Sequence, residues 1–128
     1  MGHLTGIDFV SIQADNLETA KAFYNGKLGL SIMKGPPGAV IFDSKPVPFA
    51  VRKPPSDLSA AKDYLGAGVA LWFACDDADV LHADLAADRI EIIFPPKDGP
   101  FGRYFAFRDP FGYTITAHTV QSKEIQND

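Results

Sequence analysis

The sequence has few of the residues that thiol chemistry and nucleic-acid binding require. Its single cysteine, Cys75, excludes an intrachain disulfide and a metal site built from several thiolates. Because Cys75 lies in an apolar run, we expect it to be a buried packing residue. The chain has 12 lysines and arginines against 16 aspartates and glutamates, so its net charge is -4. Phosphate neutralisation needs clustered cations, and a nucleic-acid partner is therefore not expected.

Long apolar runs are also missing. No stretch approaches the roughly 20 residues that a membrane-spanning helix needs. Residues 1–8 have neither the charged start nor the cleavage pattern of a secretory signal. We therefore expect no membrane partner and a cytoplasmic location. With 128 residues, of which 46% are hydrophobic, the chain can form one domain with a well-filled core.

The first part of the chain has the pattern of a strand, a helix and three further strands. Residues 7–14 alternate with period two, which predicts a strand. Asp15 followed by Glu18 has the spacing of a capping box, so a helix is expected to begin at this point and to end before Gly29. Three strand-like stretches separated by glycine and proline follow, at residues 30–34, 39–43 and 47–52. Pro48 places the last of them at a sheet edge or at a bulge.

The same pattern returns after a proline- and glycine-rich stretch. A strand is expected at residues 69–75, and Asp76 is expected to cap the next helix. Three strands complete the set, at residues 90–94, 103–108 and 113–120. An offset of 61 positions superposes Asp15 on Asp76 and Tyr24 on Leu85, which indicates an internal duplication.

These patterns predict an α+β fold in which residues 1–128 form a single domain of two βαβββ modules. The modules are expected at residues 7–52 and 69–120, with a connector at 53–68 and a polar tail at 121–128. Each helix would cover one face of its own sheet. The other faces of the two curved mixed sheets would then enclose a shared cavity.

Two stretches resemble the vicinal oxygen chelate superfamily, which contains glyoxalase I, extradiol dioxygenases and bleomycin resistance proteins. Residues 15–30 combine an acidic helix start, a Phe-Tyr pair and a Leu-Gly turn, as in the family's opening unit. Residues 101–112, which end in an Asp-Pro-Phe-Gly turn, are similar to the closing hairpin of the bleomycin resistance branch. Together with the duplication, the resemblance spans nearly the whole chain.

The resemblance also implies where a metal would bind, because metal-dependent members hold a divalent ion with His, Glu or Gln side chains. Those positions are occupied in this chain by Phe9, Ala70 and Thr116. The fourth strand, at residues 47–52, offers no carboxylate or imidazole in any register. Gln13 and His118 remain as donors, and two neutral groups are too few for a divalent site. We therefore predict no metal and no cofactor.

We expect the cavity to be lined by aromatic side chains with hydrogen-bonding groups among them. The predicted ligand-binding residues are Phe9, Ser11, Gln13, Phe49, Trp72, Tyr104, Thr114, Thr116 and His118. Apolar walls with a few polar groups are typical of pockets for organic ligands, and the rings suit planar or cationic compounds. The alternative is that these side chains fill a collapsed interior.

The leading hypothesis is a metal-independent small-molecule binding protein of the bleomycin-resistance type. The resemblance implies that such a protein sequesters an aromatic or cationic compound and forms a homodimer. Two alternatives remain open: a metal-dependent glyoxalase, lyase or dioxygenase-type enzyme, and a metal-free lyase or isomerase in which His118 is the base. The favoured role of His118 is that of a hydrogen-bonded residue without a part in chemistry, and His82 is expected to be solvated. No catalytic residue is assigned.

Overall fold

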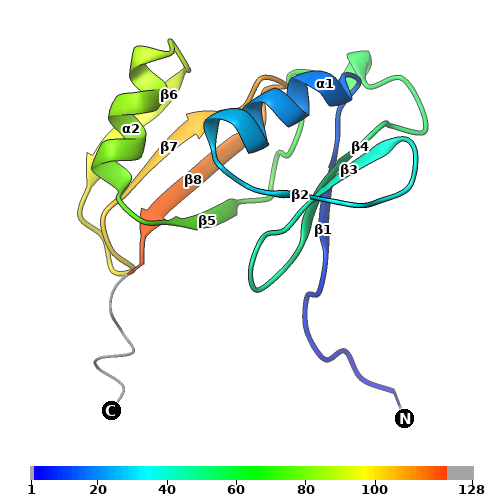
Figure 1. Ribbon diagram of the computed structural model, residues 1–128, viewed down its shortest axis with the longest axis horizontal. Coiled ribbons are helices and arrows are strands. Elements are labelled where there is room, and N and C mark those ends of the chain that lie inside the picture. The colour runs from blue at the N-terminus through cyan, green and yellow to red at the C-terminus, as the bar shows by residue number, and fades with distance from the viewer. Residues whose placement is uncertain (1, 121–128) are drawn as a thin grey trace. The chain divides into compact units, whose positions relative to one another are not determined.

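The computed structural model describes residues 2–120, and the polar tail predicted at residues 121–128 lies outside them. The chain divides into two compact units, residues 1–60 and 61–128, called here the N-terminal unit and the C-terminal unit. Each unit contains one four-stranded sheet with mixed strand directions (Figure 1). The predicted α+β class with βαβββ topology is confirmed. No helix among the described residues has the length and apolarity to cross a membrane.

In the N-terminal unit the strands follow the order β1-β4-β3-β2. The strands are β1 (Val10–Gln13), β2 (Ile32–Met33), β3 (Ala39–Phe42) and β4 (Phe49–Arg52). The helix α1 (Leu17–Ala20) continues as a π-helical segment, Lys21–Lys27, and Gly29 follows with a left-handed φ of 82°. The first and last strands pair in parallel, which requires a crossover connection.

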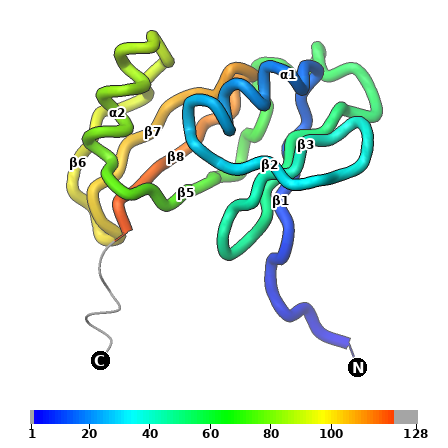
Figure 2. The backbone as a smooth tube through the Cα atoms, in the orientation of Figure 1, coloured from blue at the N-terminus to red at the C-terminus, as the bar shows by residue number. Residues whose placement is uncertain are grey.

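The C-terminal unit repeats this arrangement with the strand order β5-β8-β7-β6. The strands are β5 (Leu71–Cys75), β6 (Ile92–Lys97), β7 (Tyr104–Arg108) and β8 (Thr114–Thr119), and the helix is α2 (Ala78–Ala87). Figure 2 traces the backbone from β1 through α1 to β2 and β3, and from β5 through α2 to β6, β7 and β8. A short 3-10 helix, Ser59–Ala61, lies where the units meet in sequence.

Both helices begin one residue later than predicted. Asn16 and Asp77, rather than Asp15 and Asp76, are the N-caps. Each side chain accepts a hydrogen bond from the backbone N–H three residues ahead, at 3.0 Å and 3.1 Å. Asn16 follows Asp15, and Asp77 follows Asp76. Because aspartate is also a favourable N-cap, the sequence alone does not decide which residue of each pair caps the helix.

The predicted position of Pro48 at a sheet edge or bulge is wrong. The strand that follows it, β4, lies between β1 and β3 in the interior of the sheet. Pro48 immediately precedes the first ladder residue, Phe49, and its carbonyl accepts a hydrogen bond from Val10 N at 3.1 Å. The missing N–H of proline is harmless at this position because the ladder begins after it.

The core of each unit lies between its helix and one face of its sheet. In the N-terminal unit the ring of Tyr24 contacts those of Phe42 and Phe49, with centroids 5.7 Å and 5.1 Å away. In the C-terminal unit Phe105 is fully buried, and His82 of α2 packs edge-on against it at 5.4 Å. His82 is therefore half-buried, and its predicted solvated position is wrong.

The face of each sheet that points away from its own helix is called the distal face below.

The Asp109 carboxylate organises the turn between β7 and β8. Asp109 is 4% exposed, and its Oδ1 accepts hydrogen bonds from Phe111 N and Tyr113 N, both at 2.9 Å. Gly112 has a φ of 102°, a region that favours glycine. Asp109 thus stabilises the turn that the Asp-Pro-Phe-Gly sequence indicates.

Replacing Asp109 with Ala should destabilise the protein by about 2 kcal/mol, because two backbone donors lose a charged acceptor. Asp109→Asn keeps an oxygen acceptor and should lose less. Asp63→Ala, at an exposed position, is the matched control and should change stability by less than about 0.5 kcal/mol. Urea unfolding followed by circular dichroism measures all three, and equal stabilities of the two alanine variants would contradict this role.

Cys75 ends β5, paired in register with Thr119, and is only partly buried. Burial raises the pKa of its thiol from 9.0 to about 11, and the charge of Asp76 adds to the effect. The thiolate fraction at pH 8 is therefore roughly 100-fold lower than for a thiol with the ordinary pKa, and the higher nucleophilicity of the thiolate offsets roughly tenfold of this.

We expect Cys75 in the native protein to react with a disulfide reagent at pH 8 about tenfold more slowly than the same thiol in urea. The rate should rise steadily with pH until the pKa of about 11 is reached, since only the thiolate reacts. Absorbance of the released thiol follows the reaction. Equal rates in the native and the unfolded protein would show that the thiol is not protected.

Candidate functional site

The distal face of the C-terminal sheet brings together several residues from different strands. Trp72 of β5 pairs in register with Thr116 of β8, and Tyr104 of β7 pairs with His118 of β8. Residues directly opposite one another on paired strands point to the same face, and so do residues two apart on one strand. Trp72, Tyr104, Thr116 and His118 therefore share the distal face, as the alternation in the sequence indicates.

Aromatic rings form a contiguous cluster on this face. Trp72 stacks on Tyr104 with ring centroids 5.4 Å apart and an interplanar angle of 21°. His118 and Phe101 meet the indole edge-on, at 5.7 Å and 6.2 Å. Trp72 is 45% exposed, so one part of its surface is packed and another faces solvent. We call the set of Trp72, Tyr104, His118, Phe101 and Phe94 the aromatic cluster.

A β-bulge adds Phe94 to the cluster. Ile92 of β6 pairs with Phe107 on the core face, whereas Phe94 pairs with Ala106 on the distal face. Two positions along β6 thus match one position along β7, which reverses the alternation. The ring of Phe94 meets Tyr104 edge-on with centroids 5.4 Å apart. Sequence alternation alone would have placed Phe94 on the same face as Ile92.

Two further residues that sequence reasoning missed support Tyr104. The Lys97 ammonium lies 4.4 Å from the centroid of the Phe94 ring and 5.5 Å from that of Tyr104, both within cation–π range. Gly99 lies against the Tyr104 ring, since a Cβ at this position would come within 2.5 Å of Tyr104 Cε1. The ring can occupy its place only because residue 99 has no side chain.

His118 is held by the loop that precedes β7. Its Nδ1 lies 3.0 Å from the carbonyl oxygen of Phe101. A carbonyl only accepts hydrogen bonds, so Nδ1 donates, and in the neutral ring Nε2 keeps the acceptor lone pair. The loop is itself tied down, because Arg103 Nε lies 3.1 Å from Asp79 Oδ2 and its Nη1 lies 3.3 Å from Asp98 Oδ1.

The two threonines predicted to bind ligand have different surroundings. Thr116 is 9% exposed and lies between Trp72 and Ala106 in the register of the sheet. Thr114 is exposed, and its Oγ1 accepts a hydrogen bond from Arg108 Nη1 at 2.9 Å. It lies four positions along β8 from His118, about 13 Å away at the rise of a strand. The structure thus places Thr116 beside the aromatic cluster and Thr114 outside it.

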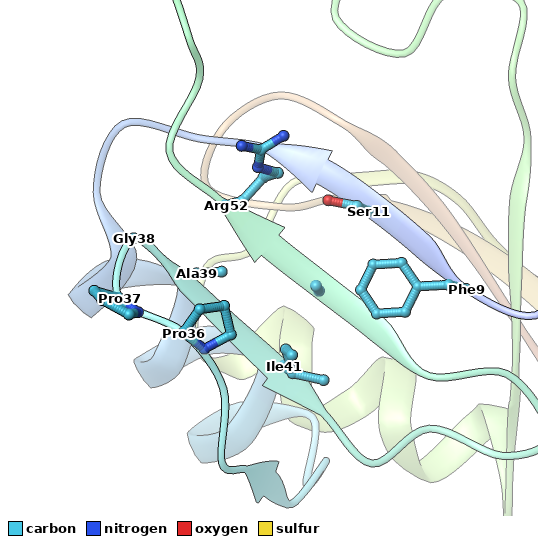
Figure 3. A pocket seen from close by; sticks show the side chains of 9 residues that line it. Phe9, Ser11, Pro36, Pro37, Gly38, Ala39, Ile41 and Arg52 are labelled. Carbon is cyan, nitrogen blue, oxygen red and sulfur yellow. The ribbon is translucent and has the colours of Figure 1, made fainter.

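The distal face of the N-terminal sheet carries a pocket of about 380 Å³ (Figure 3). Its lining comes from β1 and the residue before it, from β3 and β4, and from the loop before β3. The lining residues are Phe9, Ser11, Pro36, Pro37, Gly38, Ala39, Ile41, Ala50 and Arg52. Phe9 and Ser11 were predicted from the sequence. Gln13 shares the face through its pairing with Arg52 but is not part of the lining.

The predicted cavity position of Phe49 is wrong. Phe49 pairs with Val10 and Phe42, is 2% exposed and packs against Tyr24 in the core. Its neighbour Ala50 lines the pocket instead. Adjacent residues of a strand point to opposite faces, so Phe49 and Ala50 cannot both belong to the pocket.

The residues at the positions where the resemblance implies metal ligands do not fit a divalent cation. Phe9 and Ala70 have no donor atom, and Thr116 offers one neutral hydroxyl. Among residues 2–120, no group of three or more His, Cys, Asp or Glu side chains is placed to hold a metal ion. Divalent cations in proteins are held by several convergent oxygen, nitrogen or thiolate donors.

Solved structures with the same fold include a putative glyoxalase family protein, an antibiotic binding protein and a lyase. A putative glyoxalase family protein from Bacillus anthracis is 21% identical, with a TM-score of 0.73, covering 94% of this chain and 99% of its own. TnmS3, an antibiotic binding protein from Streptomyces sp. CB03234, is 22% identical, with a TM-score of 0.70 and coverages of 94% and 100%. A lactoylglutathione lyase from Agrobacterium tumefaciens is 23% identical, with a TM-score of 0.64 and coverages of 89% and 92%.

At such identities the likeness to these structures concerns the fold. A search of curated proteins gives no match. The family model of the Glyoxalase/Bleomycin resistance protein/Dioxygenase superfamily matches residues 6–116, which is most of the chain. The chain therefore belongs to the Glyoxalase/Bleomycin resistance protein/Dioxygenase superfamily.

Proposed function

We propose that this protein is a metal-independent small-molecule binding protein of the bleomycin-resistance type, which sequesters a planar aromatic compound. The observation that carries the proposal is the half-exposed Trp72 ring, held in place by its stack on Tyr104. A planar ligand can stack on an indole that its neighbours already orient, so little side-chain entropy is lost on binding. The similarity in fold to TnmS3, an antibiotic binding protein, supports this direction.

The donor set supports binding rather than chemistry on a metal. The family's ligand positions hold Phe9, Ala70 and Thr116, which together present one neutral oxygen. The thiol of Cys75 has a pKa raised by burial to about 11, so it is a poor nucleophile at neutral pH. His118 contributes a hydrogen-bonding group at the edge of the cluster, suited to a donor on the ligand.

An aromatic ligand fits the cluster better than a cationic one. The Lys97 ammonium already lies near the rings of Phe94 and Tyr104. A cationic guest would meet a like charge at these rings, and this repulsion would offset its own cation–π attraction. A neutral or anionic ring system avoids the repulsion.

We further propose that the protein is a homodimer, as the resemblance to the superfamily implies. Sedimentation velocity at several protein concentrations should give twice the mass of a 13.9 kDa chain. A monomer at all concentrations would exclude the dimer but would leave the binding proposal in place.

Trp72 is the only tryptophan, so the intrinsic fluorescence of the protein reports directly on the cluster. Titration with a panel of planar aromatic compounds should change this fluorescence saturably for at least one of them. Tyr104→Ala should weaken that binding about tenfold, because the indole loses the ring that orients it, while Tyr104→Phe should retain it. Tyr64→Ala, an exposed aromatic that is not part of the cluster, is the control. Silence across a broad panel would refute the proposal.

Gly99→Ala tests the same cluster without removing an aromatic ring. The added Cβ would lie 2.5 Å from Tyr104 Cε1, so the ring must move away from its place beside Trp72. We expect the affinity for the compound that changes the Trp72 fluorescence to fall about tenfold. Gly26→Ala is the matched control, since a Cβ there meets nothing within 4 Å. An unchanged affinity in Gly99→Ala, measured by calorimetry, would mean that the stack is not needed.

Elemental analysis of protein purified without chelator should find far less than one equivalent of Ni, Zn, Mn or Fe per chain. The expectation follows from the donors at the family positions, which do not fit such an ion. A stoichiometric metal retained through dialysis would instead favour a metal-dependent enzyme of the superfamily. Turnover of any panel compound that is abolished by His118→Ala would favour a metal-free lyase or isomerase.

A further inference from the structure

The pocket of the N-terminal unit has a polar end and an apolar end, and both are built by this unit alone. Figure 3 shows Arg52 at one end, the Phe9 ring at the other and the Ser11 side chain between them. Pro36, Pro37 and Ile41 form the side across from β1. A ligand in this pocket would therefore meet charge and apolar surface at separate places.

The strand register fixes the spacing of the two ends. Arg52 pairs with Gln13 across the parallel ladder, and Phe9 immediately precedes β1, four positions before Gln13. At the rise of a strand, the Cα atoms of Phe9 and Gln13 are about 13 Å apart. Ala50 is 2% exposed and lies in register between Ser11 and Ile41, so the middle of the pocket has a floor without a bulky side chain.

Arg52 has no carboxylate partner among residues 2–120. Two other arginines of this acidic chain are paired: Arg103 with Asp79 and Asp98, and Arg108 with Glu91. Beside Arg52 the rim of the pocket is held in place, because the carbonyl of Gly38 accepts a hydrogen bond from Lys53 N at 2.9 Å. The guanidinium is thus an available cation at the edge of an apolar pocket.

We infer that this pocket binds an aromatic compound that bears a single carboxylate group. The planar guanidinium of Arg52 matches the two carboxylate oxygens, Ser11 offers a hydroxyl midway, and the ring system lies over Ala50 toward Phe9. One arginine neutralises one negative charge, and a dianionic phosphate would need further cations that the lining lacks. The inference rests on the proposed function in treating the chain as a small-molecule binder, but it concerns a different unit from the aromatic cluster.

The exposure of Arg52 limits how much an ion pair with a ligand carboxylate can add to the affinity. An ion pair that stays in contact with water contributes modestly and is screened by salt. We therefore expect an aromatic carboxylate to bind about five- to tenfold more tightly than its neutral amide at low ionic strength. This preference should shrink toward unity as salt is added.

The test uses naphthalene-2-carboxylate and naphthalene-2-carboxamide as a matched pair, with the full chain and binding followed by amide chemical shifts in NMR titrations. The carboxylate should bind more tightly, with shifts centred on Phe9, Ser11, Ala50 and Arg52. Arg52→Gln should remove the difference between the two probes. Phe9→Ala should weaken both probes by a similar factor and preserve their ratio. Lys62→Gln, which removes one exposed positive charge elsewhere, is the control and should change neither.

Equal affinities for the two probes in the unaltered protein, a ratio unaffected by Arg52→Gln, or failure of both probes to bind would each overturn the inference. Phe9 and Arg52 are both exposed, so neither substitution should prevent folding, and the amide spectra of the variants verify this. The outcomes are separable from those of the proposed function. A Trp72 response to other panel compounds combined with no carboxylate preference refutes the inference alone. A carboxylate preference at Arg52 combined with a silent Trp72 refutes the aromatic cluster alone.

Discussion

The packing of one face of each sheet against its helix is the constraint on which the rest of the structure depends. In the N-terminal unit Tyr24, Phe42 and Phe49 are buried together, and a one-residue slip of β4 would turn Phe49 out and Ala50 in. The register is therefore determined by the core. Once the core face is set, every alternate side chain must lie on the distal face, where both candidate binding sites are found.

Much of the fold and part of the site could be predicted because they follow from periodicity. The alternation in β5 and β8 places Trp72 and His118 on one face, and the internal repeat gives the same topology to both units. Phe49 departs from the prediction because the alternation along β4 assigns it to the core, and its aromatic character alone does not indicate a ligand-facing position. The predicted N-caps precede the observed ones by one residue because both neighbouring side chains are able to cap a helix.

The remaining features depend on contacts between residues that are distant in sequence or on local irregularities. The pocket needs Arg52 and the prolines before β3, which meet only when β4 and β3 pair. Gly99 matters only because Tyr104 packs on it, and no pattern in the sequence marks that contact. Side chains on the distal faces can be exchanged without loss of the core, so the same topology accommodates a lyase in one relative and an antibiotic binding protein in another.

The bulge in β6 has a consequence for how this face could diversify. β6 is the outermost strand of its sheet, so an inserted or deleted residue there disturbs only one neighbouring strand. Such a change would rotate Phe94 between the two faces of the sheet and leave the pairing of the inner strands intact. A single codon at an outer strand could thereby add or withdraw a ring from the surface offered to ligands, a route to new selectivity that spares the hydrophobic interior.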